Sequence, residues 1–171
     1  MVKRTLQSAK LFQNNNYPGE IYPPIIVGYQ IKTPENIGNI IRLADNAGCR
    51  EAIFITSLEK IRLSKIKKTA SSSFDAVKWR FCKPDEFESV IPDDYQWVAI
   101  ETSSDSKDIF KSKLPQKAAL FVGNEISGIN NQILDRCEQI VHVPLFGNNS
   151  SLNVSHALAI ALFEWQRQSF Y

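Results

Sequence analysis

The stretch IIVGYQIKTPENIGNIIRLADNAGCREAIFITS, residues 25–57, contains the pattern that decides the fold. It begins and ends with apolar, β-branched runs, at 25–31 and 51–57, which are typical of buried strands. Between them four apolar side chains keep helical spacing: Ile37, Ile40, Ile41 and Ala44. Pro34 marks the start of this helix and Gly48 its end. A strand, a helix and a second strand in this order predict two parallel strands joined by a helical crossover.

The same alternation of strand-like and helix-like segments continues along the chain. Further strand-like runs occupy 76–81, 96–102, 118–123 and 139–144, with helix-like stretches between them. We therefore expect an α/β fold, with a mostly parallel sheet covered by helices on both faces. A final helix over 153–167 is too apolar for a free surface helix, so it packs in the core or in a subunit contact. Residues 1–23 are expected to form a polar N-terminal arm, and 24–171 a single domain.

Composition excludes several classes of protein. The formal net charge of the 171 residues is +2, too small for a histone-like or ribosomal-tail protein. Cys49, Cys82 and Cys137 are far apart and form no CxxC pair, so neither a disulfide framework nor a metal site is expected. We predict a cytoplasmic protein, because no membrane span and no signal peptide is recognisable.

Three polar clusters follow predicted strands or begin predicted helices. They are Pro34-Glu35-Asn36 with Arg42, Gly123-Asn124-Glu125 with Gly128, and the run from Gly147 to Ser155. Each has a purely structural interpretation: Asn36 as a helix cap, Arg42 as a solvated side chain, Glu125 as a partner of a helix dipole. The third run, NNSSLN, could simply be a loop and an N-cap. Glycine loops of the GxGxxG and GxxxxGK[ST] types are absent, which argues against a dinucleotide dehydrogenase and a P-loop enzyme. His142 is interpreted as a satisfied histidine in or beside the core, and no catalytic triad is visible.

A basic stretch lies at 58–73, LEKIRLSKIKKTASSS. It is either a solvated helix face or a track for an RNA backbone, with Ile61, Ile66 and Leu58 or Leu63 as the apolar stripe beneath. The candidate RNA-binding residues are Lys60, Arg62, Lys65, Lys67 and Lys68. Lys3, Arg4 and Lys10 of the arm would extend the track.

Together the three clusters resemble the SpoU-like, or TrmH-like, branch of the SPOUT RNA methyltransferase superfamily. The first motif, N-x-G-x-x-x-R, reads Asn36 to Arg42, and the second, G-N-E-x-x-G, reads Gly123 to Gly128. The third, I-P-M-x-G-x-x-x-S-L-N-V-S, reads Val143 to Ser155, with Leu145 in place of the methionine. The resemblance covers about residues 24 to 168.

This resemblance implies a C-terminal deep trefoil knot that binds S-adenosylmethionine, and a homodimer formed through the final helix. The implied cofactor-binding residues are Ile100, Glu101, Thr102, Val122, Gly123, Asn124, Val143, Pro144, Leu145, Ser151, Leu152 and Asn153. The implied catalytic residues are Arg42, Asn36, Glu125, Ser151 and Asn153. Arg42 would clamp an RNA phosphate and stabilise the developing alkoxide, in its own subunit or across the dimer. Asn36 would orient Arg42 or the ribose, Glu125 and Asn153 would hold the first-motif loop, and Ser151 would bridge this network to the cofactor.

The resemblance therefore predicts transfer of a methyl group from S-adenosylmethionine to a ribose 2′-hydroxyl of RNA. We expect tRNA as the substrate, with rRNA as the alternative. A knotted RNA-binding protein without catalysis and a small-molecule α/β enzyme are the competing hypotheses from other classes. Retention of Arg42, Glu125, Ser151 and Asn153 argues against the first, and the lack of a catalytic dyad against the second.

Overall fold

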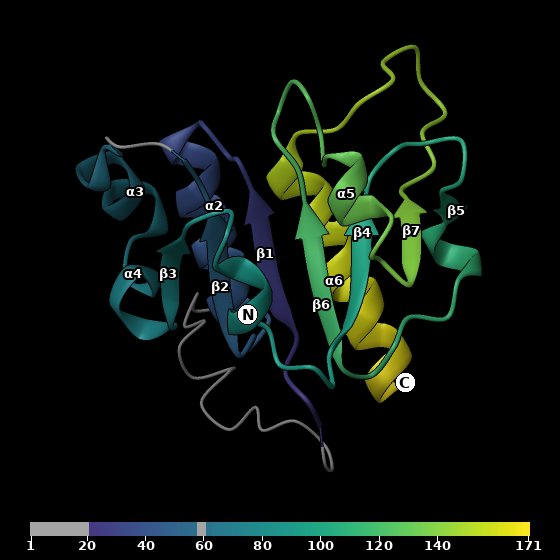
Figure 1. Cartoon of the computed structure of the whole chain (residues 1–171), viewed down its shortest axis with the longest axis horizontal. Coiled ribbons are helices and arrows are strands. Elements are labelled where there is room, and N and C mark those ends of the chain that lie inside the picture. The colour runs from purple at the N-terminus through teal and green to yellow at the C-terminus, as the bar shows by residue number, and fades with distance from the viewer. Residues whose placement is uncertain (1–20, 58–60) are drawn as a thin grey trace, which may run out of the picture.

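The fold is built on one parallel sheet. The computed structural model describes residues 21–57 and 61–171. Its strands are β1 (Ile25–Tyr29), β2 (Glu51–Ile55), β3 (Trp79–Cys82), β4 (Gln96–Ile100), β5 (Lys107–Asp108), β6 (Ala118–Val122) and β7 (Gln139–His142). They pair in the order β3-β2-β1-β6-β4-β7-β5, and every pairing is parallel. In Figure 1 the strands therefore point to one common edge, which we call the carboxyl edge.

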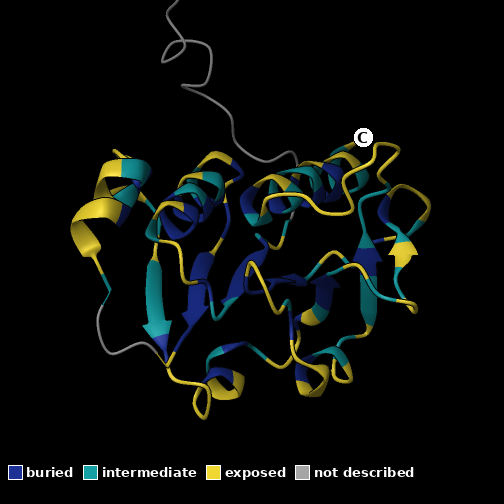
Figure 2. Cartoon of the chain, turned by 90° about the horizontal axis from the view of Figure 1, so that it is seen from above, coloured by how far each residue is buried: buried dark blue, intermediate teal, exposed yellow. Residues whose placement is uncertain are grey.

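Helices cover both faces of this sheet, as the alternation of strands and helices predicts. Helices α2 (Pro34–Asn46), α3 (Leu63–Ala70) and α6 (Val154–Phe170) pack on one face, and α4 (Ser73–Ala76) follows α3. The short α5 (Asn131–Leu134) and the 3-10 turn η1 (Phe87–Val90) pack on the other face, while η2 (Ile109–Lys111) follows β5. Figure 2 shows the buried strands between these two layers. Strands β1, β2 and β6 are apolar at nearly every position because both of their faces are covered.

Most predicted elements are confirmed, with shifted boundaries. Strand β3 lies at Trp79–Cys82 rather than 76–81, because residues 73–76 instead form α4. Strand β5 was not expected from the sequence, since two polar residues have no strand periodicity. The final helix runs from Val154 to Phe170, three residues beyond the predicted end. The trefoil knot stays a prediction.

The basic stretch forms a shorter helix than expected, and one side chain differs from its prediction. Helix α3 spans only Leu63–Ala70, and Ile66 is its buried apolar residue. Leu63 is the first residue of α3 and is 52% exposed, so its proposed place in the apolar stripe is wrong. Leu58 lies outside the described residues, as do Lys60 and the arm residues 1–20.

A glycine lets α3 approach α2 closely. A Cβ atom on Gly38 would stand 2.6 Å from the Cβ of Thr69 and 2.8 Å from the carbonyl oxygen of Ile66. Any side chain larger than hydrogen would force the two helices apart. The glycine of the first motif therefore sets the position of the basic helix.

Candidate functional site

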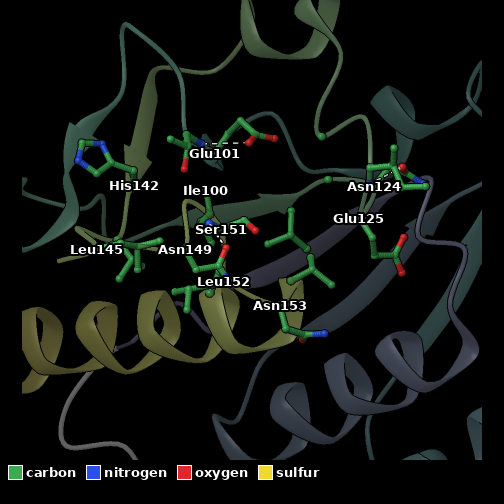
Figure 3. Close-up of a pocket in the computed structure, with 18 residues that line it drawn as sticks. Ile100, Glu101, Asn124, Glu125, His142, Leu145, Asn149, Ser151, Leu152 and Asn153 are labelled. Atoms are coloured by element: carbon green, nitrogen blue, oxygen red, sulfur yellow. Dashed lines mark hydrogen bonds between the residues drawn. The ribbon is translucent and has the colours of Figure 1, made fainter. Parts of the chain in front are cut away.

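A cavity of about 470 Å³ opens at the carboxyl edge, beyond the ends of β4, β6 and β7 (Figure 3). It lies beside the boundary between β1 and β6, where the strand order reverses and ligands bind in open parallel sheets. Its walls come from the loops after the three strands and from the first turn of α6. The lining residues are Ile100, Glu101, Thr102, Val122, Gly123, Asn124, Glu125, Ile126, Gly128, His142, Val143, Leu145, Asn149, Ser151, Leu152, Asn153, Val154 and Ala157.

The loop after β6 is a tight turn that depends on its glycines. Asn124 and Gly128 form an antiparallel bridge, with backbone hydrogen bonds of 3.0 and 3.2 Å. Gly128 has a φ of +64°, a conformation that side chains disfavour. A Cβ on Gly123 would collide with the backbone of Gly128, and one on Gly128 with the carboxylate of Glu101. The second motif therefore folds into a loop that leaves no room for larger residues at either glycine.

Asn124 joins this loop to the neighbouring strand ends. Its side-chain nitrogen donates to the carbonyl oxygen of Gln30 at 2.7 Å, and its side-chain oxygen accepts from the N–H groups of Ile126 and Ser127. Gln30, which has a φ of 52°, in turn contacts Ser57 through its side-chain oxygen. The ends of β6, β1 and β2 are therefore connected by side-chain hydrogen bonds.

Glu101 supports the same loop from β4. One carboxylate oxygen accepts from the N–H of Ile129 at 2.9 Å, and the other from the N–H of Thr102 at 3.0 Å. The carboxylate thus has a structural task in addition to lining the cavity.

Three polar side chains bind the first motif to the cavity wall. The Asn36 side chain donates to Glu125 Oε1 at 2.8 Å, and the Asn153 side chain donates to Asn36 Oδ1 at 3.1 Å. The backbone N–H groups of Lys32 and Thr33 also donate to the Glu125 carboxylate, at 3.2 and 3.1 Å. The loop before α2, the loop after β6 and the start of α6 therefore meet in one network.

The electrostatics of this network keep Glu125 ionised. Partial burial alone raises the pKa of Glu125. The hydrogen bonds from Asn36 and from the Lys32–Thr33 backbone outweigh that effect, so the pKa lies below its ordinary value. A carboxylate that accepts three hydrogen bonds and has a low pKa is a poor general base. Its role is to hold the loop before α2, and we call it the Glu125 latch.

Asn153 has a second task at the start of α6. It is the N-cap of that helix, and its side-chain oxygen accepts from the N–H of Ser155 at 2.9 Å and from its hydroxyl at 2.7 Å. The sequence placed the start of the helix at about Asn153, and the structural interpretation of the NNSSLN run as a loop and an N-cap is confirmed at this residue. The same amide therefore fixes both the helix start and, through its nitrogen, the position of Asn36.

The predicted cofactor-binding residues gather around this cavity. All of them line it except Pro144. Lining residues that were not predicted are Ile126, Gly128, His142, Asn149, Val154 and Ala157. Ile126, Gly128, Asn149 and Val154 stand within the quoted motifs, so the motifs could have indicated them. His142 also accepts or donates a hydrogen bond with the Ser106 hydroxyl at 2.9 Å, which confirms a satisfied histidine.

Arg42 and Ser151 lie apart from the hydrogen-bonded network. Arg42 is exposed on α2, does not line the cavity, and has no ion pair with another described residue. Ser151 lines the cavity, and within residues 21–57 and 61–171 its one hydrogen bond runs from its backbone N–H to the side-chain oxygen of Asn149 at 3.4 Å. Among the described residues, the side chain of Asn36 therefore bonds to Glu125 and Asn153 and not to Arg42, and Ser151 makes no direct bond to this network.

The candidate RNA-binding residues of α3 are exposed. Lys65 pairs with Glu35 at 3.1 Å, and Lys67 pairs with Asp75 at 3.6 Å. Arg62 and Lys68 have no such partner among residues 21–57 and 61–171. All four side chains face solvent, as either interpretation of this stretch requires.

The cysteines fit a structural role. Cys49 and Cys82 are buried and Cys137 is half-buried, and all three are free thiols. Burial raises the pKa of each thiol, so each stays protonated and unreactive at neutral pH. No group of three potential metal ligands occurs in the described part of the chain. There is also no helix among the described residues with the length and hydropathy needed to cross a membrane.

Comparison with known proteins finds relatives in sequence and in structure. The 23S rRNA (guanosine-2′-O-)-methyltransferase RlmB of Salmonella typhi is 26% identical over 168 residues, which are 95% of this chain and 69% of that protein. The crystal structure of the SpoU methyltransferase AviRb from Streptomyces viridochromogenes, in complex with the cofactor AdoMet, superposes with a TM-score of 0.79 at 25% identity. That match covers 89% of this chain but only 60% of AviRb.

A structure described as giving insights into 2-OH methylation of C/U34 on tRNA superposes with a TM-score of 0.77 at 24% identity. This match covers 86% of this chain and 97% of the chain in that structure. The model of the SpoU rRNA Methylase family matches residues 23–163, which include all three motifs and the whole cavity. The chain therefore belongs to the SpoU rRNA methylase family.

Proposed function

We propose that this protein is an S-adenosylmethionine-dependent RNA methyltransferase that modifies a ribose 2′-hydroxyl. The observation that carries the proposal is the convergence of the family's three motifs on one site. The second and third motifs line the cavity, and Asn36 of the first is bonded to both through Glu125 and Asn153. Family membership and relatives that are named RNA methyltransferases support the same reaction.

The cavity residues fit S-adenosylmethionine. A volume of about 470 Å³ suits a ligand of this size. Leu145 and Leu152 are each 38% exposed inside the cavity wall, so an adenine ring would bury apolar surface there. The segment 145–150 has no regular secondary structure and forms no backbone–backbone hydrogen bonds with described residues, which leaves its peptide groups for a ligand. When bound, the cofactor supplies a methyl group on a positively charged sulfur.

The protein's own residues then have distinct tasks. Glu125 holds the first-motif loop as an ionised latch, so it does not take the proton of the acceptor hydroxyl. Asn36 is buried between Glu125 and Asn153, which fixes the start of α2 and hence the position of Arg42. Ser151, at the cavity wall, is placed to contact the bound cofactor.

Arg42 acts at the cavity of a partner subunit in this proposal. Its guanidinium stays protonated, so it clamps an RNA phosphate and stabilises the developing alkoxide rather than removing a proton. It does not line the cavity of its own chain. Helix α6 presents Phe163, 51% exposed, and Tyr171 follows its end in full exposure, which favours a homodimer formed through this helix.

Hybrid subunits test this arrangement. A dimer can combine an Arg42→Ala subunit with a Ser151→Ala subunit, whose change lies at the cavity wall outside the Asn36 network. It keeps one intact site if Arg42 acts across the interface, and none if it acts in its own chain. Purified hybrids should then recover about half of the wild-type rate. Hybrids as inactive as both parents, or a monomer in light scattering, would overturn the dimeric site.

Methyl transfer tests the reaction itself. Transfer of a tritiated methyl group to unmodified RNA should fall about 100-fold or more in Arg42→Ala, while S-adenosylmethionine binding in calorimetry stays unchanged. The control is Lys113→Gln, which should behave as wild type. Lys113 is exposed, precedes β6 and has no ion pair among the described residues. Equal transfer by Arg42→Ala and wild type would remove Arg42 from the mechanism.

The RNA class is the finer part of the proposal. We expect tRNA, and the competing substrate is rRNA, on which the RlmB relatives act. Mass spectrometry of both RNA pools from a deletion strain identifies the missing ribose methylation. A loss confined to rRNA would contradict the tRNA proposal and leave the reaction type intact.

A further inference from the structure

A second hollow at the carboxyl edge has no task in the proposed methyl transfer. It is an open groove of about 520 Å³ beyond the ends of β2 and β3, beside the start of α3. It is lined by Thr56, Ile61, Leu63, Phe81, Cys82, Lys83 and Glu86. Figure 1 shows β2, β3 and α3 at the opposite side of the sheet from β4 and β7, whose ends carry the cavity.

The floor of the groove is aromatic and fixed. Phe81 is half-buried at the end of β3, with its ring centroid 5.5 Å from that of Trp79 and 5.8 Å from that of Phe54. These neighbours hold the ring in one orientation. Leu63, half exposed, stands at the rim. A flat apolar ligand could therefore stack here without prior rearrangement of the side chains.

The rim of the groove combines positive charge with one carboxylate. Lys83 lines the groove, and Arg62 stands between the lining residues Ile61 and Leu63; both are exposed and neither has an ion pair with another described residue. Glu86 contributes an exposed carboxylate to the same rim. An aromatic floor, cations for a phosphate and one acceptor for a base N–H are together the groups that a nucleotide needs.

The groove and the cavity lie on the same edge of the sheet and are connected by hydrogen bonds. Asn124, which lines the cavity, donates to the backbone of Gln30, and Gln30 contacts Ser57, which follows the groove residue Thr56. The ends of β6 and β2 are two strand spacings apart, about 10 Å. That separation is within reach of the nucleotides next to a ribose that is held at the cavity.

We propose that this groove binds a nucleotide flanking the methylated one, with its base on Phe81 and its phosphate at Arg62 and Lys83. This inference rests on the proposed function, because it takes RNA as the ligand of the protein. It adds a specificity site that reads the sequence or the single-stranded character of the RNA beside the acceptor. A double-stranded helix cannot place an unstacked base on Phe81, so the groove selects single-stranded or looped RNA.

Equilibrium binding tests the groove independently of methyl transfer. The probe is a fluorescein-labelled single-stranded RNA of mixed sequence, about 12 nucleotides long, and the full-length protein is titrated at several salt concentrations. Phe81→Leu should weaken binding about tenfold and leave its salt dependence unchanged, because it removes stacking alone. Lys83→Gln should weaken binding and reduce the slope of log K against log[salt] by about one. Lys113→Gln is the matched control and should change neither.

The outcomes separate this proposal from the proposed function. If Phe81→Leu and Lys83→Gln bind the probe as tightly as Lys113→Gln, with equal salt slopes, the groove is not an RNA site, whether or not the protein methylates RNA. If all variants bind as expected but no RNA accepts a methyl group, the groove stands and the proposed function falls. Phe81 also packs in the core, so Lys83→Gln, at an exposed position, decides the case if Phe81→Leu lowers the folded fraction in circular dichroism.

Discussion

The two halves of the carboxyl edge differ in how their loops and side chains are arranged. Beyond β4, β6 and β7 the loops are locked by glycines, by Glu101 and by the Glu125 latch around a cavity. Beyond β2 and β3 the surface is an open groove with an aromatic floor and exposed cations. A small cofactor needs walls on several sides, whereas a polymer needs a surface along which it can continue. One sheet edge therefore offers a closed site and an open one.

The largest expected effect concerns the closed half. Gly128→Ala combines a disfavoured left-handed residue with a collision against Glu101, which we expect to lower the free energy of unfolding by about 2–4 kcal/mol. Binding of S-adenosylmethionine should weaken with it, because the same loop lines the cavity. Chemical denaturation and calorimetry measure the two effects.

Gly147→Ala is the control for this prediction. Nothing lies within 4 Å of the position of its Cβ, and its φ is not positive, so stability should hardly change. Similar losses in Gly128→Ala and Gly147→Ala would show that the closed half is not held by steric fit.

A smaller effect on stability is expected at the contact between α2 and α3, beside the open half. Gly38→Ala should lower the free energy of unfolding by about 1–2 kcal/mol, since overpacking against Thr69 and the backbone of Ile66 exceeds the gain in helix propensity. The displaced α3 should also weaken binding of RNA but not of S-adenosylmethionine. A variant as stable as wild type would indicate that α3 is free to shift.

The Glu125 latch gives the closed half a pH dependence. The pKa of Glu125 is lower in the folded protein than in the unfolded chain, so its stabilisation is present above the unfolded value near 4.5 and is lost as the pH falls through the folded value. Glu125→Gln should therefore cost about 1 kcal/mol at pH 7, discounted for the contact of this side chain with water, and less in acid.

Denaturant titrations between neutral pH and pH 3 compare Glu125→Gln with Glu86→Gln, a change at an exposed groove carboxylate that makes no contact with the first-motif loop. A pH profile of Glu125→Gln that stays parallel to that of wild type would contradict the latch.

The smallest effect on stability is expected at the basic helix. Lys65→Gln removes an exposed pair with Glu35, and exposed ion pairs contribute little to stability because water and salt screen them. If α3 forms part of the RNA track, the salt slope of RNA binding should fall by about one while stability stays the same. An unchanged slope would mean that the basic stretch is only a solvated helix face.

Much of the fold and of the candidate site could be predicted from the sequence. The apolar runs gave six of the strands within a few residues, and motif spacing gave nearly the whole cavity wall, because strand ends of a parallel sheet share one edge. Strand β5 was missed because Lys107 and Asp108 pair only through backbone groups beside β7. The exposure of Leu63 was missed because periodicity does not tell where a helix begins.

The sequence by itself determined the alternation of strands and helices, the three motifs and hence the family. Only the tertiary structure decided that Glu125 accepts three hydrogen bonds from the first-motif loop and helix, that Arg42 lies away from the cavity of its own chain, and that Phe81 lines a second groove. Periodicity and motifs depend on neighbours along the chain, which a sequence displays directly. Hydrogen bonds such as that between Asn153 and Asn36 join residues 117 positions apart, and their geometry exists only once the sheet has brought those residues together.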